Sequence, residues 1–402
     1  MLSIAEARAR IEAAVQPAAE TERLPTAEAG GRYLAEPVTA RVANPAFDNS
    51  AMDGYALRAA AIPADGGELP VAATVAAGEA PSALPAGACV RIMTGAPLPE
   101  GADTVVMQEK VTAEGDHAHF AERPPLGDNV RRTGEDTRPG DELAGRGERV
   151  SPALISALIT AGVAEVVVHR RPRALVLSTG AELRDAGEAL EAGQIYDSNR
   201  PGLVAALREL GADVTDGGCV ADDLEDLRSA FRKAAAYDLV VTSGGVSVGA
   251  FDQVRQVLEE QGEIGLWKVA IKPGKPFAFG RLGQAHLFGM PGNPVSALVT
   301  FRQFTAPAVV RLMGGTWLPP RVTAAAGADY RRRGTERTEF LPASLASNDG
   351  HLTATPHQQP GSGRIAGFAR ADCLIVVPAG KEGFDAGDSV TVEPLGGDWG
   401  GS

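Results

Sequence analysis

Residues 266–296 read LWKVAIKPGKPFAFGRLGQAHLFGMPGNPVS, and the lysines of the chain are concentrated in this stretch. The chain contains 38 Lys and Arg residues, but only six are Lys, and three of those six are Lys268, Lys272 and Lys275. Side chains alternate in an extended strand, so Lys268 and Lys272 are predicted to share one face. The Pro-Gly pair that follows turns the chain and brings Lys275 toward the same place.

Two interpretations of these lysines remain open from the residues alone. A Lys ammonium is a compact charge that suits phosphate or another oxyanion, but lysines also occur on solvated strand edges, where they discourage pairing with another chain. The MPGNP sequence at 290–294 ends an apolar run and precedes a helical pattern, so amides at a helix start lie close in sequence to the lysines. That combination favours an anion site.

Composition limits the classes of partner. A length of 402 residues suggests two to four domains at about 100–200 residues each. A net charge of −13 argues against nucleic acid or an anionic membrane as the partner. The three cysteines form no C-x-x-C motif and are expected to be small buried hydrophobes, and His117 with His119 suits a surface pair better than a metal site. The N-terminus resembles an amphipathic helix and no transmembrane run is evident, so a soluble cytoplasmic protein is expected.

The fold class follows from alternating strand and helix patterns in the middle of the chain. Strands are predicted at 174–179, 213–220 and 238–242 and through the lysines, and helices at 200–210, 224–236, 252–261 and 295–313. This pattern predicts an open, mostly parallel α/β sheet with helices on both faces. The predicted domains are a helical and extended linking domain (1–43 and 147–172), a small β-rich domain (44–146), the α/β domain (173–315) and a C-terminal β-barrel-like domain (316–402).

Ligands of open α/β sheets bind beyond the carboxyl ends of the strands, and polar residues follow each predicted strand there. The loop 242–249, TSGGVSVG, has the context of a phosphate-cradling loop, although a tight turn would also explain it and it matches neither the P-loop nor G-x-G-x-x-G. The carboxylates Glu182, Asp222 and Asp252 would suit Mg²⁺ as a set, whereas each alone would also suit a helix N-cap.

Several polar loops elsewhere have two readings. Asp53 lies in FDNSAMDGYAL, Thr94 follows a strand-like run, and Asp136 belongs to the charged loop NVRRTGEDTRPGD. Each could be a plain surface turn or part of a site. The Arg331–Arg333 run is expected to be solvated surface.

Eight ordered motifs carry a resemblance to a known family. They are DNSAMDGYA (48–56), RIMTGAPLPEGADTVVMQE (91–109), GED (134–136), STGAEL (178–183), YDSNR (196–200), TSGGVSVG (242–249), WKVAIKPGKPFAFG (267–280) and MPGNPVSA (290–297). Together they closely resemble the molybdopterin molybdotransferase family of the MoeA type, to which the gephyrin E domain is similar. The resemblance covers most of the chain up to about residue 300 and is weak beyond about 315.

The resemblance implies that molybdate is inserted into adenylylated molybdopterin with magnesium, giving molybdenum cofactor and AMP, in an elongated homodimer. Molybdopterin adenylyltransferase and molybdoenzyme maturation proteins are the implied partners. The implied catalytic residues are Asp53, Thr94, Asp136, Glu182, Asp252, Lys268 and Lys272, and the implied metal ligands are Glu182, Asp222 and Asp252. The implied substrate-binding residues are Ser243, Gly244, Gly245, Ser247, Gly249, Lys275, Pro291, Gly292, Pro294, Ser296, Arg337 and Ser362.

Some alternatives stay open at this stage. Asp222 matches the family pattern only with a one-residue gap, so Asp223 is the other candidate. The preceding adenylyl transfer, performed by a related α/β domain, is an alternative reaction, and a binding or scaffold protein is an alternative outside enzymes. The residues do not decide between molybdate and tungstate. Nor do they decide whether loops 48–56 and 91–97 act on the same subunit or on a partner.

Overall fold

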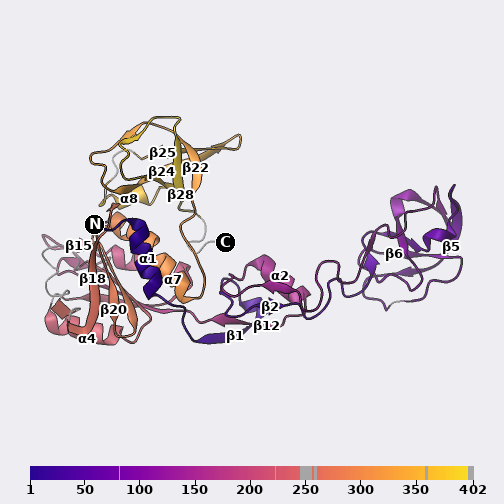
Figure 1. Cartoon of the computed structure of the whole chain (residues 1–402), viewed down its shortest axis with the longest axis horizontal. Helices are drawn as coiled ribbons and strands as arrows, with labels where there is room; N and C mark the ends of the chain where they lie inside the picture. The colour runs from indigo at the N-terminus through magenta and orange to yellow at the C-terminus, as the bar shows by residue number, and fades with distance from the viewer. Residues whose placement is uncertain (81, 222, 245–255, 258–259, 358–360, 397–402) are drawn as a thin grey trace.

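The chain is elongated in the computed structural model, which describes residues 1–80, 82–221, 223–244, 256–257, 260–357 and 361–396. Figure 1 shows an α/β domain and a C-terminal barrel together at one end, with a small β domain at the opposite end. A slender linking unit connects them; it contains β1 (Thr21–Pro25), β12 (Glu165–His169) and α2 (Pro152–Thr160). In the described part of the chain, no helix is both long enough and apolar enough to cross a membrane.

A six-stranded sheet forms the centre of the α/β domain, in the order β16-β13-β17-β21-β20-β18. Its strands are β13 (Arg173–Thr179), β16 (Asp213–Val220), β17 (Leu239–Ser243), β18 (Gly262–Lys268), β20 (Pro276–Leu282) and β21 (Ala285–Met290). The first four strands in the sheet order pair in parallel. The last two do not, because β20 is antiparallel to both of its neighbours.

The lysine strand β18 keeps the predicted direction, because two antiparallel pairings make it run parallel to β21 and β17, but β20 and β21 were not predicted as separate strands. Only residues 269–275 connect β18 to β20, and only residues 283–284 connect β20 to β21. A parallel connection needs a crossover of about a dozen residues or more, whereas two residues suffice for an antiparallel hairpin. Gly283, with φ of 59°, adopts the left-handed conformation that a two-residue hairpin requires.

Helices cover both faces of the sheet. Ala174 and Val176 of β13 belong to the core under α1 (Ile4–Ala14), α3 (Asn199–Glu209), α6 (Pro294–Thr300) and α7 (Ala306–Leu312). Leu175 and Leu177 belong to the core under α4 (Leu224–Ala234). Alternation along a strand that is buried on both faces produces this division.

Helix α1 differs from the predicted grouping, because it packs on the α/β domain and not in the linking unit. A reciprocal pair of hydrogen bonds between Ser3 and Glu6 caps its start. Ala7 and Ile11, four residues apart and therefore on one face, are buried in the core of the α/β domain. The buried face of the helix decides where the N-terminus docks.

The helix predicted at 295–313 is divided by a π-helical turn, Phe301–Thr305. Pro307 has no N–H to donate to the carbonyl oxygen of Gln303, and π turns often accommodate such a gap. The Gln303 carbonyl instead accepts a hydrogen bond from Arg8 Nε of α1 at 3.0 Å. The helix predicted at 252–261 lies mostly outside the described residues.

The C-terminal domain contains a closed five-stranded barrel, which confirms the barrel-like prediction. Its strands are β22 (Val322–Ala326), β24 (Thr338–Asn348), β25 (His351–Pro356), β26 (Cys373–Val377) and β28 (Ser389–Pro394), and β24 pairs with β26 to complete the ring. A short strand from the α/β domain, β19 (Ile271–Lys272), adds to β24 in parallel. The prediction that Lys268 and Lys272 share one strand face is wrong, because the chain leaves the sheet after Lys268 and joins the barrel.

The small β domain is a six-stranded sheet in the order β7-β4-β6-β5-β9-β8. The strands are β4 (Gly54–Leu57), β5 (Gly67–Val75), β6 (Cys89–Ile92), β7 (Thr104–Met107), β8 (Val111–Glu114) and β9 (His117–Phe120). Cys89 is buried here and Cys373 is buried in the barrel, as expected, whereas Cys219 is exposed, contrary to the prediction. His119 on the edge pair β8–β9 lies beside Glu68 and Glu114, as a surface pairing predicts.

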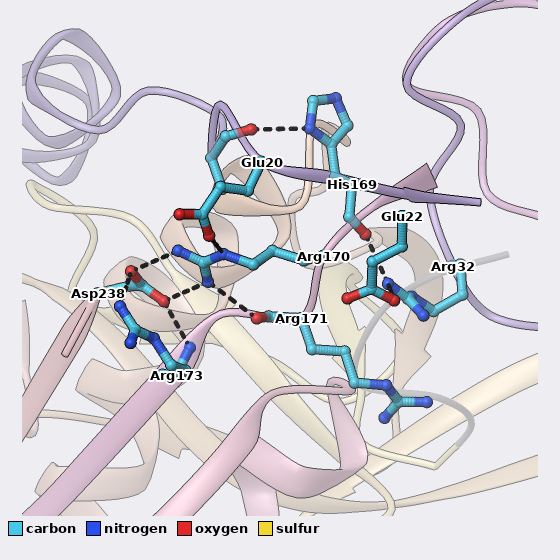
Figure 2. A network of polar contacts seen from close by, with 9 residues as sticks. Glu20, Glu22, Arg32, His169, Arg170, Arg171, Arg173 and Asp238 are labelled. Atoms are coloured by element: carbon cyan, nitrogen blue, oxygen red, sulfur yellow. Dashed lines mark hydrogen bonds and ion pairs between the residues drawn. The ribbon is translucent and has the colours of Figure 1, made fainter. Parts of the chain in front are cut away.

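Charged contacts hold the linking unit to the α/β domain (Figure 2). Arg170, just after β12, forms a two-pronged ion pair with Asp238 at 2.6 and 2.8 Å, and the backbone amide of Arg173 donates to the same carboxylate at 2.7 Å. His169 Nδ1 lies 3.0 Å from the carbonyl oxygen of Ala18. Burial alone would raise the pKa of Asp238, but these hydrogen bonds outweigh it and lower the pKa to about 2.

Replacing Asp238 with Asn should therefore destabilise the α/β domain by about 2 kcal/mol at neutral pH. A carboxyl whose pKa is depressed by folding stabilises the fold above its unfolded pKa, and that contribution is lost as the pH falls through the folded pKa. The difference in thermal unfolding between Asp238→Asn and wild type should thus shrink from about pH 4 to about pH 2. Asp213→Asn, at an exposed aspartate that starts β16, is the control. A difference that does not change with pH would contradict this role of the carboxylate.

Candidate active site

The carboxyl ends of the parallel strands meet at one edge of the sheet, here called the rim. Ser178, at the end of β13, lies opposite Ser243 of β17, and Ser243 lies opposite Met290 of β21. Lys268 reaches the same edge because two successive antiparallel pairings return β18 to the direction of β21. The rim predicted from the sequence is thus assembled, although by a different topology.

Asn199, at the start of α3, holds two parts of the rim together. Its Nδ2 donates to Ser243 Oγ at 2.8 Å and to the carbonyl oxygen of Gly292 at 2.7 Å. Gly244 follows with φ of 87°, and a Cβ there would lie 2.5 Å from the carbonyl oxygen of Thr179, so only glycine fits. Sequence reasoning missed Asn199, although it stands in the quoted YDSNR motif.

A cleft of about 890 Å³ lies between the rim and the barrel. Its walls come from the 272–276 turn, from the 291–296 segment at the start of α6, and from the barrel. Eight of the predicted site residues line it: Glu182, Lys272, Lys275, Pro291, Gly292, Ser296, Arg337 and Ser362. The cleft therefore joins residues from both sides of the boundary between the α/β domain and the barrel.

The cleft is rich in positive charge, and most of that charge comes from the barrel. Its lining includes Lys272, Lys275, the Arg331–Arg333 run and Arg337. Arg331 also pairs with Asp385, and Arg337 donates to the carbonyl oxygen of Ile271 at 3.3 Å. These cations lie close together in an acidic protein, as expected for a small anionic ligand.

The prediction that the arginine run is solvated surface is wrong for Arg332, whose side chain is 1% exposed. Its guanidinium donates to three barrel carbonyl oxygens, those of Arg337, Pro378 and Lys381, at 2.6–2.8 Å. A buried guanidinium needs such acceptors, and two of the three come from residues 46 and 49 positions away in the sequence. The three consecutive arginines in the sequence do not indicate which acceptors surround Arg332.

The start of α6 fastens the two walls. The backbone amide of Val295 donates to the carbonyl oxygen of Ser362 at 3.1 Å, and Pro294 has no amide proton. Two of the amides expected to face an anion are therefore not available to one, and the side chain of Ser296 is buried. Lys268 is exposed at the end of β18 and is not among the lining residues.

Three models of known protein regions match almost the whole chain. Residues 2–162 match the MoeA N-terminal region (domains I and II), residues 175–311 match a probable molybdopterin binding domain, and residues 324–395 match the MoeA C-terminal region (domain IV). The chain belongs to the MoeA family.

Full-length relatives agree with this assignment. The molybdopterin molybdenumtransferase of Haemophilus influenzae is 40% identical over 400 residues, which cover 98% of this chain and 99% of the relative. Molybdopterin molybdenumtransferase 2 of Mycobacterium tuberculosis is 36% identical, covering 96% and 98%. A crystal structure of the molybdopterin biosynthesis MoeA protein of Pyrococcus horikoshii OT3 superposes with a TM-score of 0.84 at 27% identity, covering 98% of this chain and 100% of that one.

The remaining predicted acidic and hydroxyl residues of this MoeA-family chain lie in the small β domain and its adjoining loops. Asp53 Oδ1 accepts hydrogen bonds from the amide and the hydroxyl of Thr94, both at 2.7 Å. Asp136 accepts one from Asn44 Nδ2 at 2.7 Å. The Thr94 amide, followed by its hydroxyl, lowers the pKa of Asp53. Figure 1 shows the small β domain, with β5 and β6, at the opposite end of the molecule from β18 and β24, so one chain holds these residues far from the α/β domain and the barrel.

The predicted magnesium set is only partly described. Glu182 is exposed at the cleft, whereas Asp222 and Asp252 lie outside the described residues, as do Gly245, Ser247 and Gly249. Asp223, the alternative to Asp222, caps α4 by accepting from the amides of Glu225 and Asp226 at 2.9 and 3.3 Å. Across the described residues, no group of three or more His, Cys, Asp or Glu side chains is arranged to hold a metal ion.

Proposed function

We propose that this chain is a molybdopterin molybdenumtransferase that inserts molybdate into adenylylated molybdopterin, forming molybdenum cofactor and releasing AMP. The observation that carries the proposal is the cationic cleft at the sheet rim, in a chain that matches named molybdopterin molybdenumtransferases along nearly its whole length. Molybdate and the substrate phosphates are anions, and clustered Lys and Arg side chains are suited to bind them.

The cleft suggests a division of roles. Lys272, Lys275 and Arg337 would receive molybdate, with the hydroxyls of Ser296 and Ser362 as additional donors. Ser243 and Gly244, together with Pro291, Gly292 and Pro294, would hold the phosphate end of the pterin beside it. These cations are already in position around the negative charge that develops in the transition state. They therefore stabilise the transition state without any rearrangement of the protein during the reaction.

Magnesium fits the exposed carboxylate of Glu182, because Mg²⁺ prefers oxygen ligands and usually takes only one or two protein carboxylates with substrate phosphates and water. Asp222 and Asp252 would complete the protein ligands. When bound, the ion would neutralise the pyrophosphate that must be cleaved to release AMP. Glu182 itself would orient the bound substrate at the cleft.

The distance between the two groups of site residues favours a site shared between two subunits. In a homodimer, the loops that carry Asp53, Thr94 and Asp136 would reach the partner's cleft. The elongated shape would let the small β domain extend to the partner subunit, and two-fold symmetry would then produce two equivalent shared sites in each dimer. Molybdopterin adenylyltransferase, as supplier of the adenylylated substrate, and molybdoenzyme maturation proteins are the proposed partners, in the cytoplasm.

The direct test incubates purified protein with adenylylated molybdopterin, molybdate and Mg²⁺ and measures molybdenum cofactor and AMP. Lys272→Ala should lower turnover about 100-fold, the usual effect of removing one preorganised charged donor. Thermal unfolding should fall by a few degrees, because the substitution leaves the buried carboxylate of Glu339 without its direct partner, so turnover is measured well below the unfolding transition of both proteins. Lys233→Ala, at an exposed lysine of α4, is the matched control. Wild-type turnover in Lys272→Ala would refute the lysine assignment, and adenylylation of molybdopterin from ATP would identify the preceding reaction instead.

Subunit mixing tests the shared site. Asp53→Asn and Lys272→Ala homodimers should each be nearly inactive, and random exchange of their subunits should restore about a quarter of wild-type activity. Half of the dimers would then be mixed, and each would contain one intact site of two. Failure to recover activity, with exchange verified by mass spectrometry, would mean that each site uses residues of one chain.

A further inference from the structure

A buried carboxylate lies in the wall of the cationic cleft. Glu339, on barrel strand β24, lines the cleft, and its side chain is only 5% exposed. Removing a carboxylate from water is costly unless it is paired. A buried negative charge repels an anionic ligand, so the presence of Glu339 in this wall requires an explanation.

The direct partner of Glu339 is Lys272. The Nζ of Lys272 lies 2.7 Å from Oε1 of Glu339, and the two residues are paired in the register between β19 and β24. The backbone pairing therefore delivers the lysine to the carboxylate. Within the described part of the chain, Lys272 is the one residue of the α/β domain that forms an ion pair with Glu339.

Arg332 is a more distant neighbour and does not depend on Glu339. Its NH1 lies 3.7 Å from Oε2 of Glu339, beyond hydrogen-bond distance. Each of its three guanidinium nitrogens already donates to a barrel carbonyl oxygen. Tyr330 lines the same cleft, and burial, followed by the negative charge of Glu339 and a side-chain hydrogen bond with it, raises its pKa, so it remains a neutral phenol. Losing the carboxylate would leave Lys272 without its ion-pair partner, whereas Tyr330 would stay neutral and Arg332 would keep its carbonyl acceptors.

Lys272 retains the capacity to bind an anion while it is paired. An ammonium has three N–H donors, and the contact with Glu339 uses one of them. The side chain is 35% exposed and lines the cleft, so the other donors can face a ligand. Lys275, three residues later, is exposed and has greater freedom to move.

We propose that Glu339 is a positioning residue that holds the Lys272 ammonium against the barrel wall and offsets one positive charge of the cleft. The oxyanion then binds at a defined position beside Lys272, and its affinity is low enough for it to be transferred to the pterin. This inference rests on the proposed function, and it assigns to the barrel the role of orienting a lysine that belongs to the α/β domain.

The experiment compares wild type with Glu339→Gln, Glu339→Asp, Lys272→Ala and the double variant Lys272→Ala/Glu339→Gln. Glu336→Gln, at an exposed glutamate of the same segment, is the control. Calorimetric titration measures the dissociation constants of molybdate and sulfate, and the insertion assay measures kcat and KM. Thermal unfolding reports the fold of each variant.

Glu339→Gln keeps the shape of the side chain but removes its charge, so molybdate and sulfate should both bind about tenfold tighter while kcat falls about tenfold. Glu339→Asp keeps the charge but is one methylene too short to reach Lys272. It should lower kcat similarly while leaving both dissociation constants within about twofold of wild type. In the Lys272→Ala background, Glu339→Gln should change kcat less than about twofold, because its partner is absent.

Three outcomes would overturn the proposal. The first is wild-type kcat together with wild-type anion affinities in Glu339→Gln. The second is a loss of kcat on Glu339→Gln that is as large in the Lys272→Ala background as in wild type. The third is weaker anion binding with a large loss of thermal stability in both Glu339 variants. The proposed function fails separately, if wild type makes no molybdenum cofactor. The titrations with molybdate and sulfate still test Glu339 in that case.

Discussion

The pairing of β19 with β24 is the constraint on which the cleft depends. The chain leaves the α/β sheet at Lys268, contributes two residues to the edge of a barrel strand, and returns as β20. This short excursion fastens the barrel beside the rim and places Lys272 at Glu339. Phe340, Phe368 and Leu374 also pack the C-terminal domain into the core of the α/β domain, and the β19–β24 pairing adds the register that sets Lys272 opposite Glu339. The amide of Val295, bonded to Ser362, closes the same boundary from the other wall.

The electrostatics of the cleft combine two kinds of cation. Arg332 is buried and satisfied by three carbonyl oxygens, so it contributes a fixed charge to the wall. Lys272 and Lys275 are partly or fully exposed and remain able to contact a ligand. An ammonium adapts its donors to an oxyanion, whereas the buried arginine cannot move without losing its acceptors. Glu339 lies between these two kinds of charge and limits their sum.

Sequence patterns predicted the architecture well where the signal is local. Strand and helix periodicity indicated the α/β sheet, the separate β regions and the rim, and the barrel closes as expected. The strands β20 and β21 were not predicted separately, and the two-residue connection between them at 283–284 requires an antiparallel hairpin. The burial of Arg332 was missed because its acceptors at Pro378 and Lys381 are about fifty residues away. Likewise, Asn199 acts through partners at Ser243 and Gly292 that only the fold brings near. The separation of the small β domain from the α/β domain is a property of the elongated shape, which no local pattern encodes.

Every residue role proposed above depends on the oxyanion binding in the cleft between the rim and the barrel. Anomalous diffraction at the molybdenum edge, from crystals soaked with molybdate and AMP, tests it most directly. The account predicts a molybdenum peak within the cleft, within hydrogen-bond or ion-pair reach of Lys272 or Lys275 on one wall and Arg337 or Ser362 on the other. Ordered molybdenum found only outside the cleft, with the cleft open to solvent in the crystal, would contradict it.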